Sequence, residues 1–359
     1  MSSINIVNGY IFEFPGKLVK KDLHIIDETS KETIQINAQG FIVVPGLIDY
    51  HMHLSETTYK NAVSTDVVCP SSGVAFAVDA GTVGSNDFDV FYLDVIKKSK
   101  TCVKALINYL PEGINTKTSF FNEEDNTNKI YSLFSKYPDE IVGIKFRMPK
   151  GSFDDAFGHL LKAREIAQNV GCNLVVHMTN PPKDLNLMLS VLRAGDVFCH
   201  VYHGVGETII DNCGKIKEGV ILARENGIFF DACNGKNNFS FDVLQKAIEQ
   251  NFWPDIISTD LTKTTINSAF VNSLTFIMSK YLSMGMPIEM LLKAVTYNPA
   301  KLLKLPNNYY NLEMCKDITI LKIEDEKNMF LDFSNQVYWG HKSIKPVMTI
   351  KSLEIIYLA

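Results

Sequence analysis

The sequence predicts an α/β fold, a (β/α)8 TIM barrel joined to a small β domain formed from both chain ends. Two observations carry this prediction. Eight short apolar segments recur through the middle of the chain, and several of them are followed by helical patterns. Both ends of the chain instead carry short alternating strands separated by turns. Eight strand–helix units over about 260 residues are what a barrel of this type requires.

The eight predicted strands are rich in Val, Ile, Phe and Tyr and are nearly continuously apolar. Parallel strands that are buried on both faces have this composition. The first three units are less regular, so the barrel prediction depends mainly on the second half. The predicted strands cover residues 46–54, 74–80, 103–110, 141–148, 173–179, 196–202, 228–233 and 256–261.

Helices are predicted over residues 152–171, 207–227 and 240–251. The first of these begins with Ser152 as a cap and an acidic first turn, and it ends at Gly171. Serine at the start of a helix and glycine just past its end are the usual terminal residues.

The predicted domain boundaries follow from the change of pattern at the two ends. Residues 1–46 and 310–359 read as strands and turns, so we expect them to pair into one small β domain. Residues 47–309 form the predicted barrel. With the metal site that we predict at its strand ends, it would be a metal-dependent hydrolase domain.

Composition excludes several functional classes. The net charge of −5 gives no basic surface for nucleic acid or for an acidic membrane, and no apolar run approaches the ~18 residues of a membrane span. The N-terminus lacks the basic and apolar regions of a signal peptide, and the seven cysteines include no CxxC pair. We therefore expect a cytoplasmic protein with reduced thiols and a small-molecule substrate, and we leave homo-oligomer formation open.

Ionisable side chains cluster at the ends of the predicted strands. The carboxyl ends of barrel strands meet at one face, so these side chains should converge although they are far apart in sequence. Each of them alone could be structural, but together they indicate a metal site. They are His51, His53, Lys145, His177, His200, His203 and Asp260.

The order of these residues resembles the amidohydrolase superfamily of metal-dependent hydrolases. The resemblance lies in "PGLIDYHMHL", "IVGIKFRM", "LVVHMTNPP", "GDVFCHVYHG" and "PDIISTDL", and it extends over essentially the whole chain. The most similar group is the deacetylase-type amidohydrolases, which are related to dihydroorotase. A fold of this kind hosts many chemistries, so the resemblance indicates a metal centre more specifically than a substrate.

The resemblance implies a centre of two divalent metal ions, most often Zn²⁺. His51, His53 and Asp260 would bind one ion, and His177 and His200 would bind the other. Imidazole nitrogen and carboxylate oxygen both suit zinc. Manganese, iron and a single-metal form remain open alternatives.

The resemblance also implies that Lys145 is carboxylated by CO2 or bicarbonate and bridges both ions. A lone ammonium inside an apolar strand would be costly, whereas a carbamate is an anion with two ligand oxygens. Two Zn²⁺ ions bring a charge of +4, and the carbamate, a hydroxide and Asp260 bring −3. The centre would then be nearly neutral.

The predicted activity is hydrolysis of an amide, or of an ester, in a small molecule, with deacetylation of an N-acyl compound as one form. Metal ions lower the pKa of bound water toward ~7 and polarise a carbonyl. In this scheme a metal-bound hydroxide attacks, and Asp260 acts as general base and then as general acid.

Three residues are candidates for substrate contact. Arg147 should point to the same side of its strand as Lys145, where it could bind an anionic group or make a structural ion pair. His203 and Asn234 depart from the pattern of the related proteins, which makes transfer of any family substrate to this chain unsafe.

Rival functions remain. A cyclic amidase of the dihydroorotase or dihydropyrimidinase type would be expected to carry an arginine soon after His53, but Leu54, Ser55 and Glu56 stand there. A purine deaminase using one metal would not need the bridging lysine. A non-catalytic scaffold would be expected to have lost ligands, yet all six ligand positions are filled.

Overall fold

Seven parallel strands form a curled sheet in the middle of the chain. The computed structural model describes residues 2–115, 123–148, 153–179, 181 and 184–359. Neighbouring strands of the sheet are also neighbours in sequence, from β5 at one edge to β11 at the other. The strands are β5 (Leu47–Met52), β6 (Val74–Ala80), β7 (Cys102–Asn108), β8 (Ile141–Arg147), β9 (Asn173–His177), β10 (Val197–Cys199) and β11 (Phe229–Asp231).

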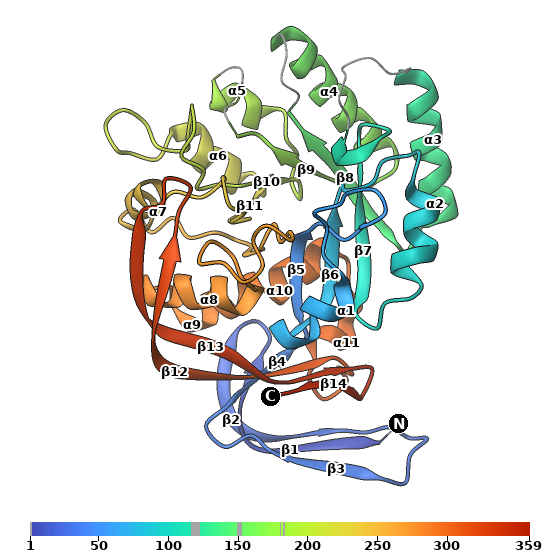
Figure 1. Ribbon diagram of the computed structural model, residues 1–359, viewed down its shortest axis with the longest axis vertical. Helices are drawn as coiled ribbons and strands as arrows, with labels where there is room; N and C mark the ends of the chain where they lie inside the picture. The colour runs from blue at the N-terminus through green and yellow to red at the C-terminus, as the bar shows by residue number, and fades with distance from the viewer. Residues whose placement is uncertain (1, 116–122, 149–152, 180, 182–183) are drawn as a thin grey trace.

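The sheet is buried, as its apolar strands predict. Every residue of β5 and of β6 is buried, so both faces of these strands are covered. Helices lie around the outside of the sheet, as Figure 1 shows for α2 to α7. The α-helices are α1 (Thr65–Val68), α2 (Phe88–Phe91), α3 (Glu123–Lys136), α4 (Phe153–Asn169), α5 (Leu185–Ser190), α6 (Glu218–Glu225), α7 (Phe241–Ile248), α8 (Leu274–Ser283), α9 (Ile288–Ala294), α10 (Tyr297–Leu302) and α11 (Asn307–Tyr310).

Three single turns of other helix types complete the helical elements of the described residues. Two are 3-10 helices and one is a π-helix that continues α2. They are η1 (Pro70–Ser72), η2 (Tyr92–Ile96) and η3 (Gly113–Asn115).

The predicted eighth strand is present only as two bridges. Residue Ile256 pairs in parallel with Asp231 of β11, and Leu261 pairs in parallel with Met52 of β5. The segment 256–261 therefore lies between the two edges of the sheet, although it is not a regular strand of the described chain.

The two chain ends form a second sheet, which confirms that part of the predicted fold. Its strand order is β14-β13-β12-β4-β1-β2, with β3 paired to β1, so strands from the C-terminus lie directly beside strands from the N-terminus. In Figure 1, β1, β2, β3 and β14 lie at the bottom, and the β12–β13 hairpin extends upward at the left. The strands of this sheet are β1 (Ser3–Glu13), β2 (Lys17–Ile25), β3 (Thr33–Asn37), β4 (Ile42–Pro45), β12 (Ile318–Leu331), β13 (Val337–Lys351) and β14 (Glu354–Leu358). The domain boundaries at residues 46 and 310 stay predictions.

Gly46 joins the two sheets. It stands between β4 of the terminal sheet and β5 of the parallel sheet, and its amide donates to the carbonyl of Asp317. A Cβ on Gly46 would collide with the Cβ of Ala75 in β6, so only glycine permits this close approach.

The predicted helix over 207–227 is wrong in its first half. Only Glu218–Glu225 is helical, because Asp211 uses its carboxylate to accept hydrogen bonds from the amides of Cys213 and Lys215. An aspartate that bonds its own backbone in this way competes with helix formation. The other two predicted helices are present as α4 and α7, and the predicted Ser152 cap lies outside the described residues.

The described chain has no helix that is both long enough and apolar enough to cross a membrane. Its longest helix, α4, has 17 residues.

Helix α8 packs against the long β13 strand and carries a fully buried lysine, Lys280. Its Nζ has no hydrogen-bond partner among the described residues and lies 3.6 Å from the ring centroid of Phe239. Burial lowers the pKa of this amine well below its ordinary 10.5, and the charge of Asp332 only partly opposes the shift.

Replacement of Lys280 by methionine should therefore stabilise the protein at neutral pH. Because the pKa of Lys280 is lower in the folded state, the unfolded chain binds more protons. The loss of folding stability caused by Lys280 is therefore largest at pH values well below its ordinary pKa of 10.5, and it fades as the pH rises toward 10.5. We expect Lys280→Met to raise the free energy of unfolding by about 1–3 kcal/mol at pH 7 and by less at about pH 9.5. Urea denaturation at both pH values measures this.

The exposed Lys246 of α7 provides the control, since Lys246→Met should change stability little at either pH. A loss of stability in Lys280→Met at both pH values would instead mean that the contact between its charge and Phe239 dominates.

Candidate metal centre

The six predicted ligands come from the carboxyl ends of the strands and lie together. Each side chain is carried there because a parallel sheet aligns the ends of its strands. His51 lies in β5 and His53 just beyond it, Lys145 lies in β8, His177 ends β9, His200 follows β10, and Asp260 lies in the bridging segment.

One group of donors surrounds the carboxylate of Asp260. Its Oδ1 lies 3.1 Å from Nε2 of His53 and 3.8 Å from Nε2 of His51. Donor atoms of all three residues lie within 4.8 Å of one another. Nitrogen and oxygen ligands of a tetrahedral zinc ion are separated by about 3.4 Å, so this group fits a divalent cation.

Lys145 lies beside this group and is buried. Its Nζ is 3.2 Å from Nε2 of His51 and 3.2 Å from Sγ of Cys199. Within the described part of the chain no carboxylate forms an ion pair with it. A buried ammonium without an anionic partner is costly, so this position fits a lysine that is converted to an anion and binds cations.

His177 and His200 form the second group, with ring centroids 4.1 Å apart. Burial lowers the pKa of His200 to about 3, although the charge of Asp260 opposes the shift. Burial and then the neighbouring His200 likewise lower the pKa of His177 well below its ordinary 6.5. These imidazoles are therefore neutral at physiological pH, which is the form that binds metals.

Asp260 is ionised although it is largely enclosed. Burial tends to raise its pKa, but the hydrogen bond with His53 and the positive charge of Lys145 are among the contributions that outweigh burial and lower the pKa. The centre thus offers one carboxylate beside the neutral imidazoles of His51, His177 and His200.

Hydrogen-bonding partners orient two of the histidine rings. Nδ1 of His53 lies 2.8 Å from Oγ1 of Thr82, whose own amide donates to Asp79. An ion bound by Nε2 would leave the proton on Nδ1, which would then donate to Thr82. Nδ1 of His200 is held in the same manner, 2.7 Å from the carbonyl oxygen of Cys233.

Two buried carboxylates fix the segment that carries Asp260. Asp49 accepts hydrogen bonds from the amide and hydroxyl of Thr259, and the hydroxyl of Ser258 donates its proton to Asp231, with both carboxylate oxygens within 2.8 Å. Burial raises the pKa of each carboxyl to about 7, while these hydrogen bonds limit the rise. They hold the 256–261 segment between β5 and β11 without regular strand pairing.

Three residues at neighbouring strand ends have left-handed backbones: His200 (φ 61°), Cys233 (φ 34°) and Asp260 (φ 55°). Residues other than glycine rarely adopt this conformation, and it tends to occur at functional sites. Next to Cys233, a Cβ on Gly235 would collide with Oδ2 of Asp260, so this loop passes directly over the carboxylate.

The three predicted substrate residues lie near the donors in different settings. His203 and Asn234 are fully buried, and no polar atom of either side chain has a partner among the described residues. Arg147 is exposed at the end of β8, and its charge helps to lower the pKa of His177. Burial lowers the pKa of His203 to about 4, so this ring is neutral.

The chain is similar in sequence to known hydrolases. A deacetylase from Agrobacterium fabrum is 30% identical over 334 residues, which cover 90% of this chain and 81% of the relative. The chain belongs to the amidohydrolase superfamily. No family model matches the sequence.

Two solved structures of the superfamily align over this chain's whole length. The structure of an adenine deaminase is 28% identical, covers all of both chains and gives a TM-score of 0.88. That of a dihydroorotase is 25% identical, covers 98% of its own chain and gives a TM-score of 0.87. The sequence resemblance to the amidohydrolase superfamily is thereby confirmed.

Several residues around this amidohydrolase centre escaped the sequence prediction. They include Cys199 and Cys233, which lie beside Lys145 and His200, and Asn238, whose amide nitrogen is 3.4 Å from Oδ2 of Asp260. The signal for Cys233 in the sequence is its position at the end of a predicted strand, whereas the cysteine spacing shows no paired motif.

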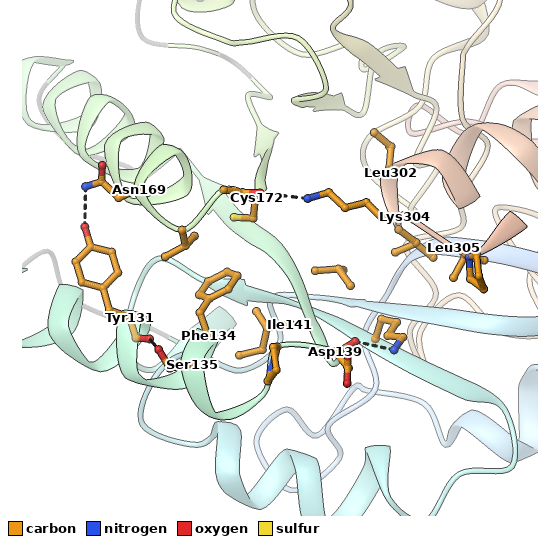
Figure 2. A pocket seen from close by; sticks show the side chains of 17 residues that line it. Tyr131, Phe134, Ser135, Asp139, Ile141, Asn169, Cys172, Leu302, Lys304 and Leu305 are labelled. Atoms are coloured by element: carbon orange, nitrogen blue, oxygen red, sulfur yellow. Dashed lines mark hydrogen bonds between the residues drawn. The ribbon is translucent and has the colours of Figure 1, made fainter.

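A groove of about 890 Å³ lies at the opposite ends of the strands. Ile141 begins β8 and Cys172 precedes β9, and both line this groove together with Lys304, whose Nζ donates to the carbonyl of Gly171 (Figure 2). The amino-terminal face of a barrel generally serves stability, and no predicted ligand lines this groove. It is therefore separate from the candidate centre.

Removal of the hydroxyl from Thr82 should weaken metal binding. Thr82→Val keeps the side-chain shape but takes away the partner that orients His53. We expect about 10- to 100-fold weaker zinc binding, the usual effect of losing such a partner. Competition with a chromogenic chelator measures the affinity.

Thr101→Val is the matched control, because the hydroxyl of Thr101 is buried without a hydrogen-bond partner in the described chain. An equal loss of affinity in both variants would argue against a role for Thr82 in orienting His53.

Proposed function

We propose that the protein is a metal-dependent hydrolase that cleaves an amide C–N bond, or an ester, in a small molecule, as an N-acyl deacetylase does. The observation that carries the proposal is the carboxylate of Asp260, 3.1 Å from His53 and 3.8 Å from His51, in a group of donors beside the buried Lys145. The deacetylase relative supports the same class.

His51, His53 and Asp260 would hold one divalent ion, and His177 and His200 a second. Lys145, carboxylated by CO2 or bicarbonate, would bridge the two, and zinc suits this set of nitrogen and oxygen donors. When bound, such ions supply a polarised carbonyl and water of lowered pKa. The 256–261 segment would act as the eighth strand that completes the barrel and brings Asp260 to the ions.

Asp260 carries the proton in this proposal. Its lowered pKa leaves it ionised at neutral pH, so it can accept a proton from the attacking water. The new C–O bond forms at the carbonyl carbon as the C–N bond breaks, and Asp260 returns the proton to the departing nitrogen. One water and one amide thus give a carboxylic acid and an amine.

Residues beside the donors would bind the rest of the substrate. His203 and Asn234 each have unpartnered polar atoms that a substrate amide or hydroxyl could satisfy. Arg147 lies at the exposed rim, where it could meet a carboxylate of an N-acyl amino acid. Dihydroorotase activity is disfavoured because Leu54, and not an arginine, follows His53.

Replacement of Asp260 by asparagine should remove the activity and keep the fold. We expect kcat to fall by about 10²- to 10⁴-fold, the range that proton transfer contributes. The assay is release of amine from a panel of N-acyl amino acids, with dihydroorotate, adenine and simple esters as the rival substrates. Circular dichroism and metal analysis of the variant accompany it.

Asp242→Asn, on an exposed face of α7, is the control and should keep the activity. A near-native kcat for Asp260→Asn would rule out the proton-transfer role. Turnover of adenine or dihydroorotate, with no N-acyl substrate turned over, would replace the deacetylase proposal with the corresponding rival.

A further inference from the structure

Cys233 occupies a position at the centre that neither predicted ligand group includes. It follows β11, is fully buried and has a left-handed backbone. That conformation directs its carbonyl oxygen onto Nδ1 of His200, and its Sγ lies 3.8 Å from Nε2 of the same ring. One residue therefore contacts both nitrogens of His200.

The Sγ of Cys233 and the Nε2 of His200 are spaced like two ligands of one metal ion. Donor atoms of His51, His200 and Cys233 lie within 4.8 Å of one another, and all three residues are buried. With bond lengths of ~2.0–2.1 Å to nitrogen and ~2.3 Å to sulfur, two ligands of a tetrahedral zinc ion are about 3.6 Å apart. The observed 3.8 Å between Sγ and Nε2 is close to that separation.

An unsatisfied polar side chain beside this cluster also points to a missing ligand. His203 is fully buried, and neither of its ring nitrogens has a partner in the described chain. It lies next to the cluster, since its backbone amide donates to the carbonyl of His200 at 3.0 Å. Buried polar groups are rarely left unpaired without a reason such as an absent ion or ligand.

We propose that Cys233 is a thiolate ligand of the centre, which adds a sulfur donor to the nitrogen and oxygen set. The inference rests on the proposed function, because it assumes that the centre binds metal. Binding forms a metal–sulfur bond and releases the thiol proton to solvent. The thiolate supplies a fourth negative charge, which balances the +4 of two divalent ions.

A soft sulfur donor changes which metal the centre prefers. Thiolate favours zinc, whereas carboxylate and water suit manganese and magnesium. The centre should accordingly select zinc over manganese more strongly than a set of imidazoles and carboxylates would.

Cys199 is the matched neighbour that should not bind. Its Sγ donates to the carbonyl of Val176 at 3.0 Å and lies 3.2 Å from Nζ of Lys145. It is as deeply buried as Cys233, but it belongs to neither group of potential metal donors among the described residues. Comparing substitutions of the two cysteines therefore distinguishes a thiolate ligand from a thiol that only lies near the centre.

The test is zinc X-ray absorption spectroscopy on the full-length protein, stripped with a chelator and reloaded with zinc and bicarbonate. Wild type and Cys199→Ser should show a zinc–sulfur distance of ~2.3 Å beside nitrogen and oxygen at ~2.0–2.1 Å. Cys233→Ser should lose the sulfur distance and bind zinc at least 10-fold more weakly, with a smaller loss of manganese affinity.

Wild-type zinc with nitrogen and oxygen neighbours alone would overturn the inference and leave the proposed function standing. The same is true of a sulfur distance that survives in Cys233→Ser or disappears in Cys199→Ser. Failure of the wild type to bind zinc at all would overturn the metal centre itself. The wild-type spectrum and the Cys199→Ser spectrum decide the question even if Cys233→Ser does not fold.

Discussion

The burial of several metal-type donors in one place is the constraint on which this centre depends. Burial keeps the imidazole of His200 neutral, while its neighbours keep Asp260 ionised. In the described residues these donors contact one another: Nε2 of His53 faces Asp260, and Nζ of Lys145 lies beside Nε2 of His51, with no carboxylate within ion-pair distance of the lysine. A cation would bind several of these donors at once, whereas any single residue of the set, taken alone, has an ordinary structural explanation.

The surrounding sheet turns this constraint into a defined geometry. Parallel strands bring their carboxyl ends to one face, and buried carboxylates such as Asp49 and Asp231 then anchor the irregular segment 256–261. Because Gly46 lets β4 run directly into β5, the terminal sheet is tied to the strand that carries His51. The positions of His51 and His53 therefore depend on packing contributed by both ends of the chain.

The sequence was informative where one physical signal dominated. Continuous apolar runs identified the buried strands, and the ionisable residues at their ends proved to lie close together. The region 207–217 was misread because Asp211 forms local hydrogen bonds that a hydrophobic pattern does not reveal. Cys233 was overlooked because its role depends on a left-handed backbone and on distances to His200, and neither can be derived from spacing along the chain.

The left-handed backbones of His200, Cys233 and Asp260 also affect how this chain can evolve. Glycine would relieve the strain at each position, so pressure for thermal stability alone favours replacements that delete a donor. Pressure for turnover opposes the same replacements. Efforts to make the protein more robust should therefore leave these three strand ends unchanged and seek improvements elsewhere, since here a more relaxed backbone and a complete centre are mutually exclusive.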